Sequence, residues 1–186
     1  EGSDIIRSLP DTNVLFISNH QTYFADVVAM FHVFNASLKG RENNIKNVLY
    51  LWNPKLNLYY VAAKETMQEG LLPRILAYAG AITVERTWRA KGKDVTEKKE
   101  VNPNDTENIK IALEDGWVIT FPQGTTRSFK PVRKGTAHII LQHKPIVVPI
   151  VIDGFRRSFD RKGLRIKKKG ILQSFVIKEP LKIDYE

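Results

Sequence analysis

The sequence predicts an α/β fold, in which a mostly parallel, mixed central sheet with flanking helices forms a single layered domain. Short runs rich in β-branched and aromatic residues alternate along the chain with segments whose apolar residues have helical spacing. The 186 residues are one domain's length, and the sequence contains no internal repeat. We therefore expect one domain over residues 1–186, with a core at about 13–155 and a basic C-terminal extension at 156–186.

The first half of the chain begins with a predicted strand, loop and helix. The run at 13–18 is β-rich, and the segment that follows it up to Phe34 has apolar residues at three- and four-residue spacings. Further strands or buried segments are predicted at 48–52, 58–65 and 81–86. Between the last two, residues 71–80 predict a helix with a proline in its first turn and a glycine at its end.

The second half continues the alternation. Residues 87–104 are charged and contain glycine and proline, which indicates an exposed excursion. Residues 105–116 predict a capped helix that ends at Gly116. The remaining elements are a strand at 117–121, a helix at 135–143, a buried strand at 145–152 and one or two strands within 171–183. Ligands of such sheets bind at the loops beyond the carboxyl ends of the strands.

The composition narrows the classes of function. A formal net charge of +9 favours phosphate-rich partners, namely nucleic acid, an anionic membrane surface or phosphorylated small molecules. The absence of cysteine excludes thiolate catalysis, thiolate metal sites and disulfides. No apolar run has the roughly 18 residues that a membrane-spanning helix needs. Zinc-ligand spacings, nucleotide-binding glycine motifs and RNA-recognition or helix-turn-helix patterns are also absent, so nucleic acid ranks last among the partners.

The segment ISNHQTYFAD (17–26) places a histidine and a carboxylate after the first predicted strand. His20 can accept a proton from a hydroxyl, and Asp26 can hold the other ring nitrogen and stabilise the imidazolium. The alternative, favoured when this segment is considered alone, is ordinary loop chemistry, with His20 bound to a loop carbonyl and Asp26 capping a helix.

Two other stretches can bind anions. The turn FPQGTTRS (121–128) exposes backbone N–H groups, and Arg127 adds a planar fork suited to phosphate, to which Arg86 can contribute. The stretch 156–169 has eight basic residues against one acid, a charge pattern that attracts anionic lipid head groups. For each arginine and for the basic stretch, the alternative is a solvated surface.

Taken together, the segments NHQTYFAD, GAITVER, FPQGTTRS and VVPIVIDG resemble, in this order, four sequence blocks of the glycerolipid acyltransferase family. The resemblance spans roughly residues 13–155 and reverses the preference at His20 in favour of catalysis. It implies transfer of a fatty acyl group from an acyl-CoA or acyl carrier protein thioester to the hydroxyl of a lysophospholipid, 1-acyl-glycerol-3-phosphate in the first instance. The resemblance further implies a reaction on the cytoplasmic face of a membrane, with the protein peripheral or anchored by a segment outside this chain, and without metal or other cofactor.

The resemblance also implies roles for individual residues. His20 is the general base and Asp26 orients it, while Arg86 and Arg127 grip the phosphate of the acceptor. The remaining residues implied at the acceptor pocket are Gln123, Gly124, Thr125 and Thr126, with a further positive charge from Lys64.

Three departures from the family pattern identify a divergent member. Asp26 lies one residue further from His20, Gln123 replaces a glutamate, and one extra residue precedes Arg127. They leave two other expectations open: a catalytically inactive lipid- or membrane-binding relative, and an acyltransferase that acts on a lyso-aminolipid, whose carboxylate arginine binds as well as phosphate.

Overall fold

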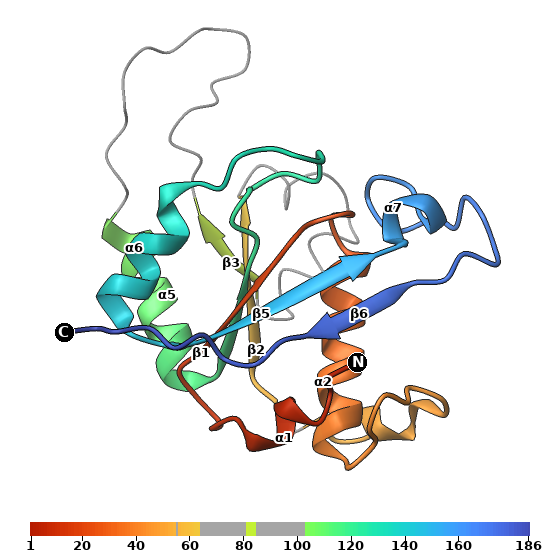
Figure 1. Cartoon of the computed structure of the whole chain (residues 1–186), viewed down its shortest axis with the longest axis horizontal. Helices are drawn as coiled ribbons and strands as arrows, with labels where there is room; N and C mark the ends of the chain where they lie inside the picture. The colour runs from red at the N-terminus through yellow and green to blue at the C-terminus, as the bar shows by residue number, and fades with distance from the viewer. Residues whose placement is uncertain (55, 64–80, 85–102) are drawn as a thin grey trace, which may run out of the picture.

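In the computed structural model, which describes residues 1–54, 56–63, 81–84 and 103–186, six strands form one sheet with the order β3-β2-β4-β1-β5-β6 (Figure 1). The first five strands of this order are parallel to their neighbours, and β6 pairs antiparallel with β5. The strands are β1 (Val14–Ser18), β2 (Leu58–Ala63), β3 (Ala81–Val84), β4 (Trp117–Thr120), β5 (Ile146–Asp153) and β6 (Ser174–Ile177).

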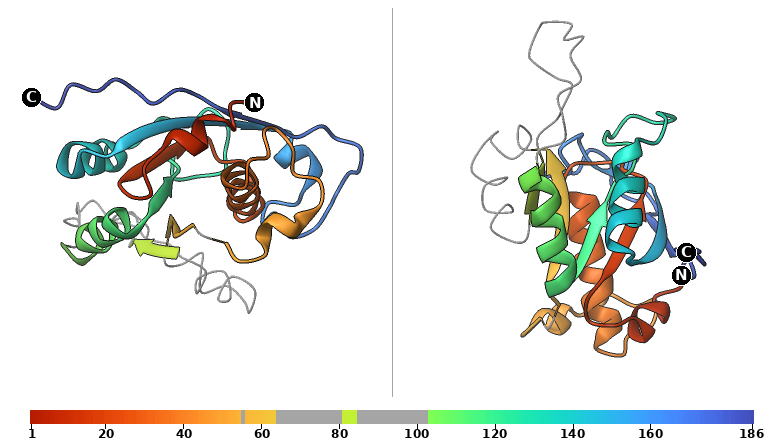
Figure 2. Two further views of the ribbon diagram at one scale, coloured as in Figure 1. Left: turned by 90° about the horizontal axis from the view of Figure 1, so that it is seen from below. Right: turned by 90° about the vertical axis from the view of Figure 1, so that its left-hand side faces the viewer.

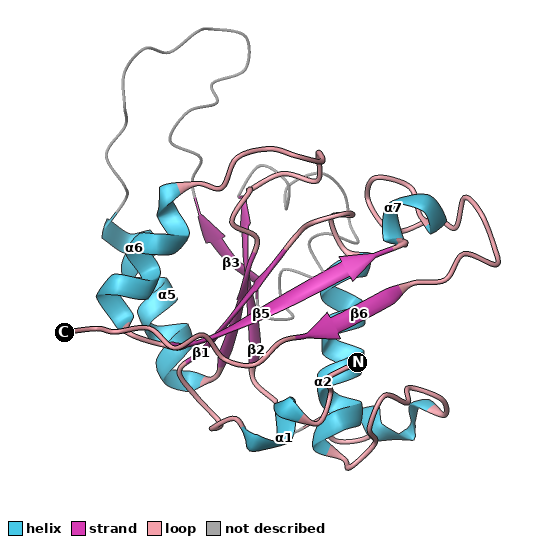
Figure 3. Ribbon diagram, viewed as in Figure 1, coloured by secondary structure: helices cyan, strands magenta, loops and turns pink. Residues whose placement is uncertain are grey.

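Helices cover both faces of the sheet. The helix α2 (Ala25–Leu38) packs on one face, and α5 (Pro103–Asp115) and α6 (Lys134–His143) pack on the other (Figures 2 and 3). Three short elements complete the described part: α1 (Ile5–Ser8), the 3-10 helix η1 (Val48–Leu51) and α7 (Phe155–Ser158). The predicted α/β class, with its mostly parallel mixed sheet and flanking helices, is confirmed.

The alternation of side chains along β1 produces a core on each face of the sheet. Phe16 points toward α2, where its ring lies 4.5 Å from that of Phe34 and 5.4 Å from that of Trp117. Leu15 points to the opposite face and packs with Leu113 of α5 and with Val118 of β4. Both faces of this central strand are therefore buried, as expected for a parallel strand covered on two sides.

The structure also corrects three expectations. The segment 48–52 is not a strand, because Asn47 adopts a φ of 59° and accepts a hydrogen bond from the N–H of Leu49, which winds the chain into η1. The helix expected at 105–116 begins earlier, at Pro103. The strand β5 is only partly buried, with Val151 exposed. The predicted helix at 71–80 and most of the excursion at 87–104 lie outside the described residues.

Loops that are distant in sequence meet at the carboxyl ends of the parallel strands. Figure 1 shows the 121–133 loop and the segment after β5 on this side of the molecule, with α1 and η1 at the opposite end. Within the described ranges, no helix is long and apolar enough to cross a bilayer.

Candidate active site

The loop after β1 is tied to β5 by an asparagine. The side-chain amide of Asn19 donates to the carbonyl of Ile152 at 2.8 Å, and its oxygen accepts from the N–H of Ile152 at 2.9 Å. This two-point contact replaces the strand pairing that ends at Ser18 and Ile150. It fixes the starting direction of the loop that carries the histidine.

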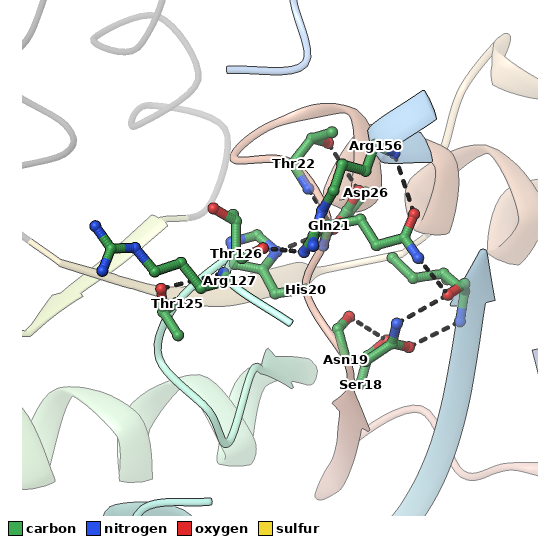
Figure 4. A network of polar contacts seen from close by, with 11 residues as sticks. Ser18, Asn19, His20, Gln21, Thr22, Asp26, Thr125, Thr126, Arg127 and Arg156 are labelled. Carbon is green, nitrogen blue, oxygen red and sulfur yellow. Dashed lines mark hydrogen bonds and ion pairs between the residues drawn. The ribbon is translucent and has the colours of Figure 1, made fainter. Parts of the chain in front are cut away.

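His20 and Asp26 face one another as the sequence predicts. Nδ1 of His20 lies 3.0 Å from Oδ2 of Asp26 (Figure 4). With Nδ1–H donated to the carboxylate, the neutral ring presents Nε2 as its proton acceptor. The pair therefore has the arrangement of a general base held in one tautomer by a carboxylate.

Asp26 is fully buried, yet its carboxylate is well compensated. Oδ2 also accepts from the N–H of Gln21 at 2.6 Å and of Thr22 at 3.0 Å, and Oδ1 accepts from the Thr22 hydroxyl at 2.7 Å. Asp26 lies in the first turn of α2, where the helix dipole favours negative charge. The extra residue between His20 and Asp26 is thus accommodated in a loop whose N–H groups converge on the carboxylate.

The histidine ring joins the first loop to the one after β4. It stacks on Phe121 with ring centroids 3.8 Å apart and an interplanar angle of 19°. Its side chain is 13% exposed, whereas that of Asp26 is 0% exposed. The imidazole is therefore partly open to solvent, while the carboxylate behind it is shielded from water.

The 121–133 loop is closed on itself by Gln123. The side-chain amide of Gln123 donates to the carbonyl of Lys130 at 2.7 Å. A glutamate carboxylate has no hydrogen to donate in this contact. The amide of Gln123 therefore makes a contact within the loop that the family's glutamate could not make, and its predicted place at the acceptor pocket stays a prediction.

The same loop holds Arg133 against the glycine of its turn. Gly124 has a φ of +59°, and a Cβ on it would lie 2.7 Å from the guanidinium of Arg133. The positive φ favours glycine here, and any side chain would have to displace the guanidinium of Arg133. Thr126 is buried and Thr125 half-buried. The predicted Gly-Thr-Thr turn closely follows Phe121, on which the His20 ring stacks, and Arg133 lies against its glycine.

The predicted arginines and lysine are not all placed at His20. Arg127 is exposed, and in Figure 4 its side chain extends away from the histidine. Its backbone N–H donates to the Thr125 hydroxyl at 3.3 Å. Lys64 and Arg86 lie outside the described residues, so their predicted roles stay predictions.

Arg156 is a site residue that the sequence analysis missed. Its guanidinium donates to the carbonyl of Thr126 and to the hydroxyl of Ser128, and its backbone N–H donates to Oε1 of Gln21 at 3.1 Å. It therefore ties the loop after β4 to the loop after β1 that carries His20. The sequence counted Arg156 within a basic stretch, although its position directly after a predicted parallel strand was the signal available.

The segment after α7 also holds the loop that carries His20. The N–H groups of Tyr23 and Phe24 donate to the carbonyls of Arg161 and Lys162 at 3.1 and 3.0 Å. Gly163, with a φ of +77°, lies so close that a Cβ on it would be 2.6 Å from the nitrogen of Ala25. The basic extension thus forms part of the frame that holds His20 and Asp26.

The described acidic side chains near His20 are engaged by the protein itself. Asp153 is engaged by the backbone N–H of Gly154, which lowers the pKa of this carboxyl, and by Gln21 and Arg157. Among the described residues, no three histidine, aspartate or glutamate side chains are grouped as metal ligands.

Comparison with known protein families agrees with this geometry. The family model described as acyltransferase matches residues 2–153, most of the chain. Curated proteins and solved structures give no match to it. With a shielded histidine–aspartate pair at the carboxyl edge of a parallel sheet and a family match over most of its length, the chain belongs to the glycerolipid acyltransferase family, whose members transfer acyl groups to lipid-type acceptors.

Proposed function

We propose that this protein transfers a fatty acyl group from the thioester of acyl-CoA or acyl carrier protein to the hydroxyl of a lysophospholipid, 1-acyl-glycerol-3-phosphate in the first instance. The observation that carries the proposal is the contact between His20 and the buried Asp26. A nearly buried imidazole that presents Nε2 beside a turn of small residues suits removal of a proton from an alcohol.

The reaction proceeds without an acyl-enzyme. Nε2 of His20 takes the proton of the acceptor hydroxyl as its oxygen attacks the thioester carbonyl. The C–S bond of the tetrahedral intermediate then breaks, and the departing sulfur takes the proton from the imidazolium. Asp26 stabilises the positive ring between these two steps, so one residue serves as base and then as acid.

Guanidinium groups next to the Gly-Thr-Thr turn would hold the acceptor phosphate. Arg133 lies against Gly124, and exposed Arg127 can swing toward a bound anion. Arg86 and Lys64 are proposed to add to this positive field, as the family resemblance implies. Holding the phosphate at a distance from the reacting hydroxyl positions that hydroxyl against His20.

The reaction is proposed to take place at an anionic membrane surface, on the cytoplasmic side where acyl-CoA and acyl carrier protein are found. The excess of positive charge in the chain supports this placement. Acceptor and product both carry an acyl chain, so neither needs to leave the membrane.

The test is acyl transfer from radiolabelled long-chain acyl-CoA and acyl carrier protein. The acceptors are 1-acyl-glycerol-3-phosphate, glycerol 3-phosphate and a lyso-aminolipid. Labelled phosphatidate is the expected product. A labelled aminolipid alone would reassign the acceptor. If neither donor acylates any acceptor, the proposed reaction is wrong and a non-catalytic lipid-binding protein remains.

Replacing Arg156 by alanine is expected to lower kcat about tenfold or more. Hydrogen bonds from a charged group contribute about 1.5–3 kcal/mol each, and 1.4 kcal/mol corresponds to a factor of ten. Arg156 donates two such bonds to the loop after β4. The measurement is kcat together with the thermal midpoint, and Arg156→Lys should recover only part of the rate.

Arg157→Ala is the matched control for this prediction. Arg157 is the next residue, and its guanidinium pairs with Asp153 at 2.8 Å on the exposed surface. Exposed pairs of this kind contribute little. Equal losses of kcat in the two variants would show that general positive charge, rather than the Arg156 contacts, supports the reaction.

A further inference from the structure

A phenylalanine is fully exposed next to the active site. Phe129 is 100% exposed and has a φ of +55°, a conformation that aromatic residues seldom adopt. The loop is held on both sides of it, by the Gln123 contact with Lys130 and the Arg156 contact with Ser128. The backbone is therefore fixed on both sides of Phe129, and the ring projects into solvent from an ordered loop.

The loop after α7 also exposes apolar side chains from an ordered backbone. Its apolar side chains Leu164, Ile166 and Leu172 are exposed, the last of them at 83%. A bridge between Phe159 and Ile166 gives this loop a defined shape. Monomeric surfaces tolerate single exposed apolar residues, but a group of them at one edge indicates a surface that meets a partner.

Basic residues surround these apolar side chains. The segment 127–134 contains four basic residues and no acid, and 156–169 contains eight basic residues and one acid. That acid, Asp160, is occupied by the N–H groups of Leu164 and Arg165 at 2.8 and 3.1 Å. The charge complements an anionic surface, and interspersed apolar side chains suit a lipid interface.

Both loops border the catalytic loop. The first contacts it through Arg156, which reaches Thr126, Ser128 and Gln21. The second contacts it through the carbonyls of Arg161 and Lys162. In Figure 1 both lie on the side of the molecule where the parallel strands end. A bilayer that touches both loops would therefore lie on the side of the molecule that carries His20.

We propose that Phe129 and the exposed part of 161–172 form one docking surface for an anionic lipid bilayer. Phe129 and Leu172 enter the interfacial layer, while the lysines and arginines meet phosphate head groups. The inference rests on the proposed function and adds to it the direction of approach: the acceptor passes from the bilayer to His20 without crossing water.

The opposite end of the molecule offers a matched control surface. Trp52 is 83% exposed there, next to exposed Val48 and Leu49 of η1. Figures 1 and 2 place this segment at the lower end, away from the 121–133 loop. Docking through the Trp52 end would turn the active site away from the lipid.

The experiment is sedimentation with vesicles of phosphatidylcholine, with and without phosphatidylglycerol. The variants are Phe129→Ser, the triple change Lys167→Glu, Lys168→Glu and Lys169→Glu, and Trp52→Ser as the control. Wild type is expected to bind only the anionic vesicles. Phe129→Ser should weaken binding about tenfold, the triple change should abolish it, and Trp52→Ser should leave it unchanged.

The proposed docking surface is contradicted if Phe129→Ser and the triple variant bind vesicles as wild type does. It is also contradicted if Trp52→Ser is the variant that loses binding. If wild type binds RNA more tightly than vesicles and Phe129→Ser has no effect on either, the basic residues serve nucleic acid, and the proposed docking surface is wrong. His20→Ala should dock like wild type. Because binding is measured without turnover, a protein that docks as expected but acylates nothing refutes only the proposed reaction.

Discussion

Replacing His20 by alanine is expected to lower kcat by about 10²–10⁴, because a positioned general base contributes a factor of this size. The effect should fall on kcat rather than on KM, since the acceptor phosphate and the acyl chains are held elsewhere. Acyl transfer at saturating donor and acceptor measures it, with circular dichroism to show that the sheet is intact.

His138→Ala is the control for this variant. His138 lies exposed on α6, on the far side of the sheet from α2. Its replacement removes an imidazole without touching the site and should leave kcat within twofold. Unchanged turnover in His20→Ala would contradict the role of His20 as general base. Catalysis would then have to come from positioning of the substrates by Arg133 and the Gly-Thr-Thr turn.

Asp26→Asn is expected to lower kcat by about 10²–10⁴ while preserving the shape of the side chain. An aspartate-to-asparagine change behind a catalytic histidine stabilises the wrong tautomer and no longer supports the imidazolium. The cost is compounded here because the carboxylate is fully buried and receives contacts from His20, Gln21 and Thr22. An amide cannot accept all of them. Single-turnover rates with wild type and variant measure the loss.

Thr22→Val separates the catalytic part of this loss from the structural part. The Thr22 hydroxyl donates to Oδ1, whereas His20 contacts Oδ2. The valine variant therefore removes one support of the carboxylate and keeps the histidine contact. We expect it to lower the thermal midpoint but to reduce kcat less than tenfold. Equal rates in Thr22→Val and Asp26→Asn would mean that Asp26 acts only by holding the loop.

The pairing of His20 with Asp26 was expected from the order of the four family blocks, since the segment 17–26 alone favoured ordinary loop chemistry. That the loop carrying His20 meets the turn at 121–128 was predictable from the sequence for a topological reason. Residues that follow parallel strands lie at one edge of the sheet, so a histidine after β1 and a turn after β4 had to be neighbours. The alternation of strand and helix patterns was enough for the fold class, since each element buries a periodic face.

Other parts of the site depended on contacts that no local pattern encodes. Arg156 reaches Gln21 across 135 positions of sequence. Its place shortly after a predicted strand was a signal, but Arg157 shares that place, and no local pattern shows which of the two side chains turns toward the site. Gln123 appeared as a lost carboxylate until the structure showed its amide donating to Lys130. The segment 48–52 failed for a different reason, because short apolar runs do not distinguish a strand from a helical turn.

The segment from Arg156 to Lys162, which holds the loop that carries His20, lies outside the part of the chain that defines the family. The family match ends at residue 153, whereas the contacts from Arg156, Arg161 and Lys162 to the loop begin beyond it. A chain cut at that boundary would keep β1–β5, His20 and Asp26 but lack this support. Because the residues of this frame are synthesised after the loop that they hold, the arrangement of His20 and Asp26 is completed only once these strongly non-local contacts have formed.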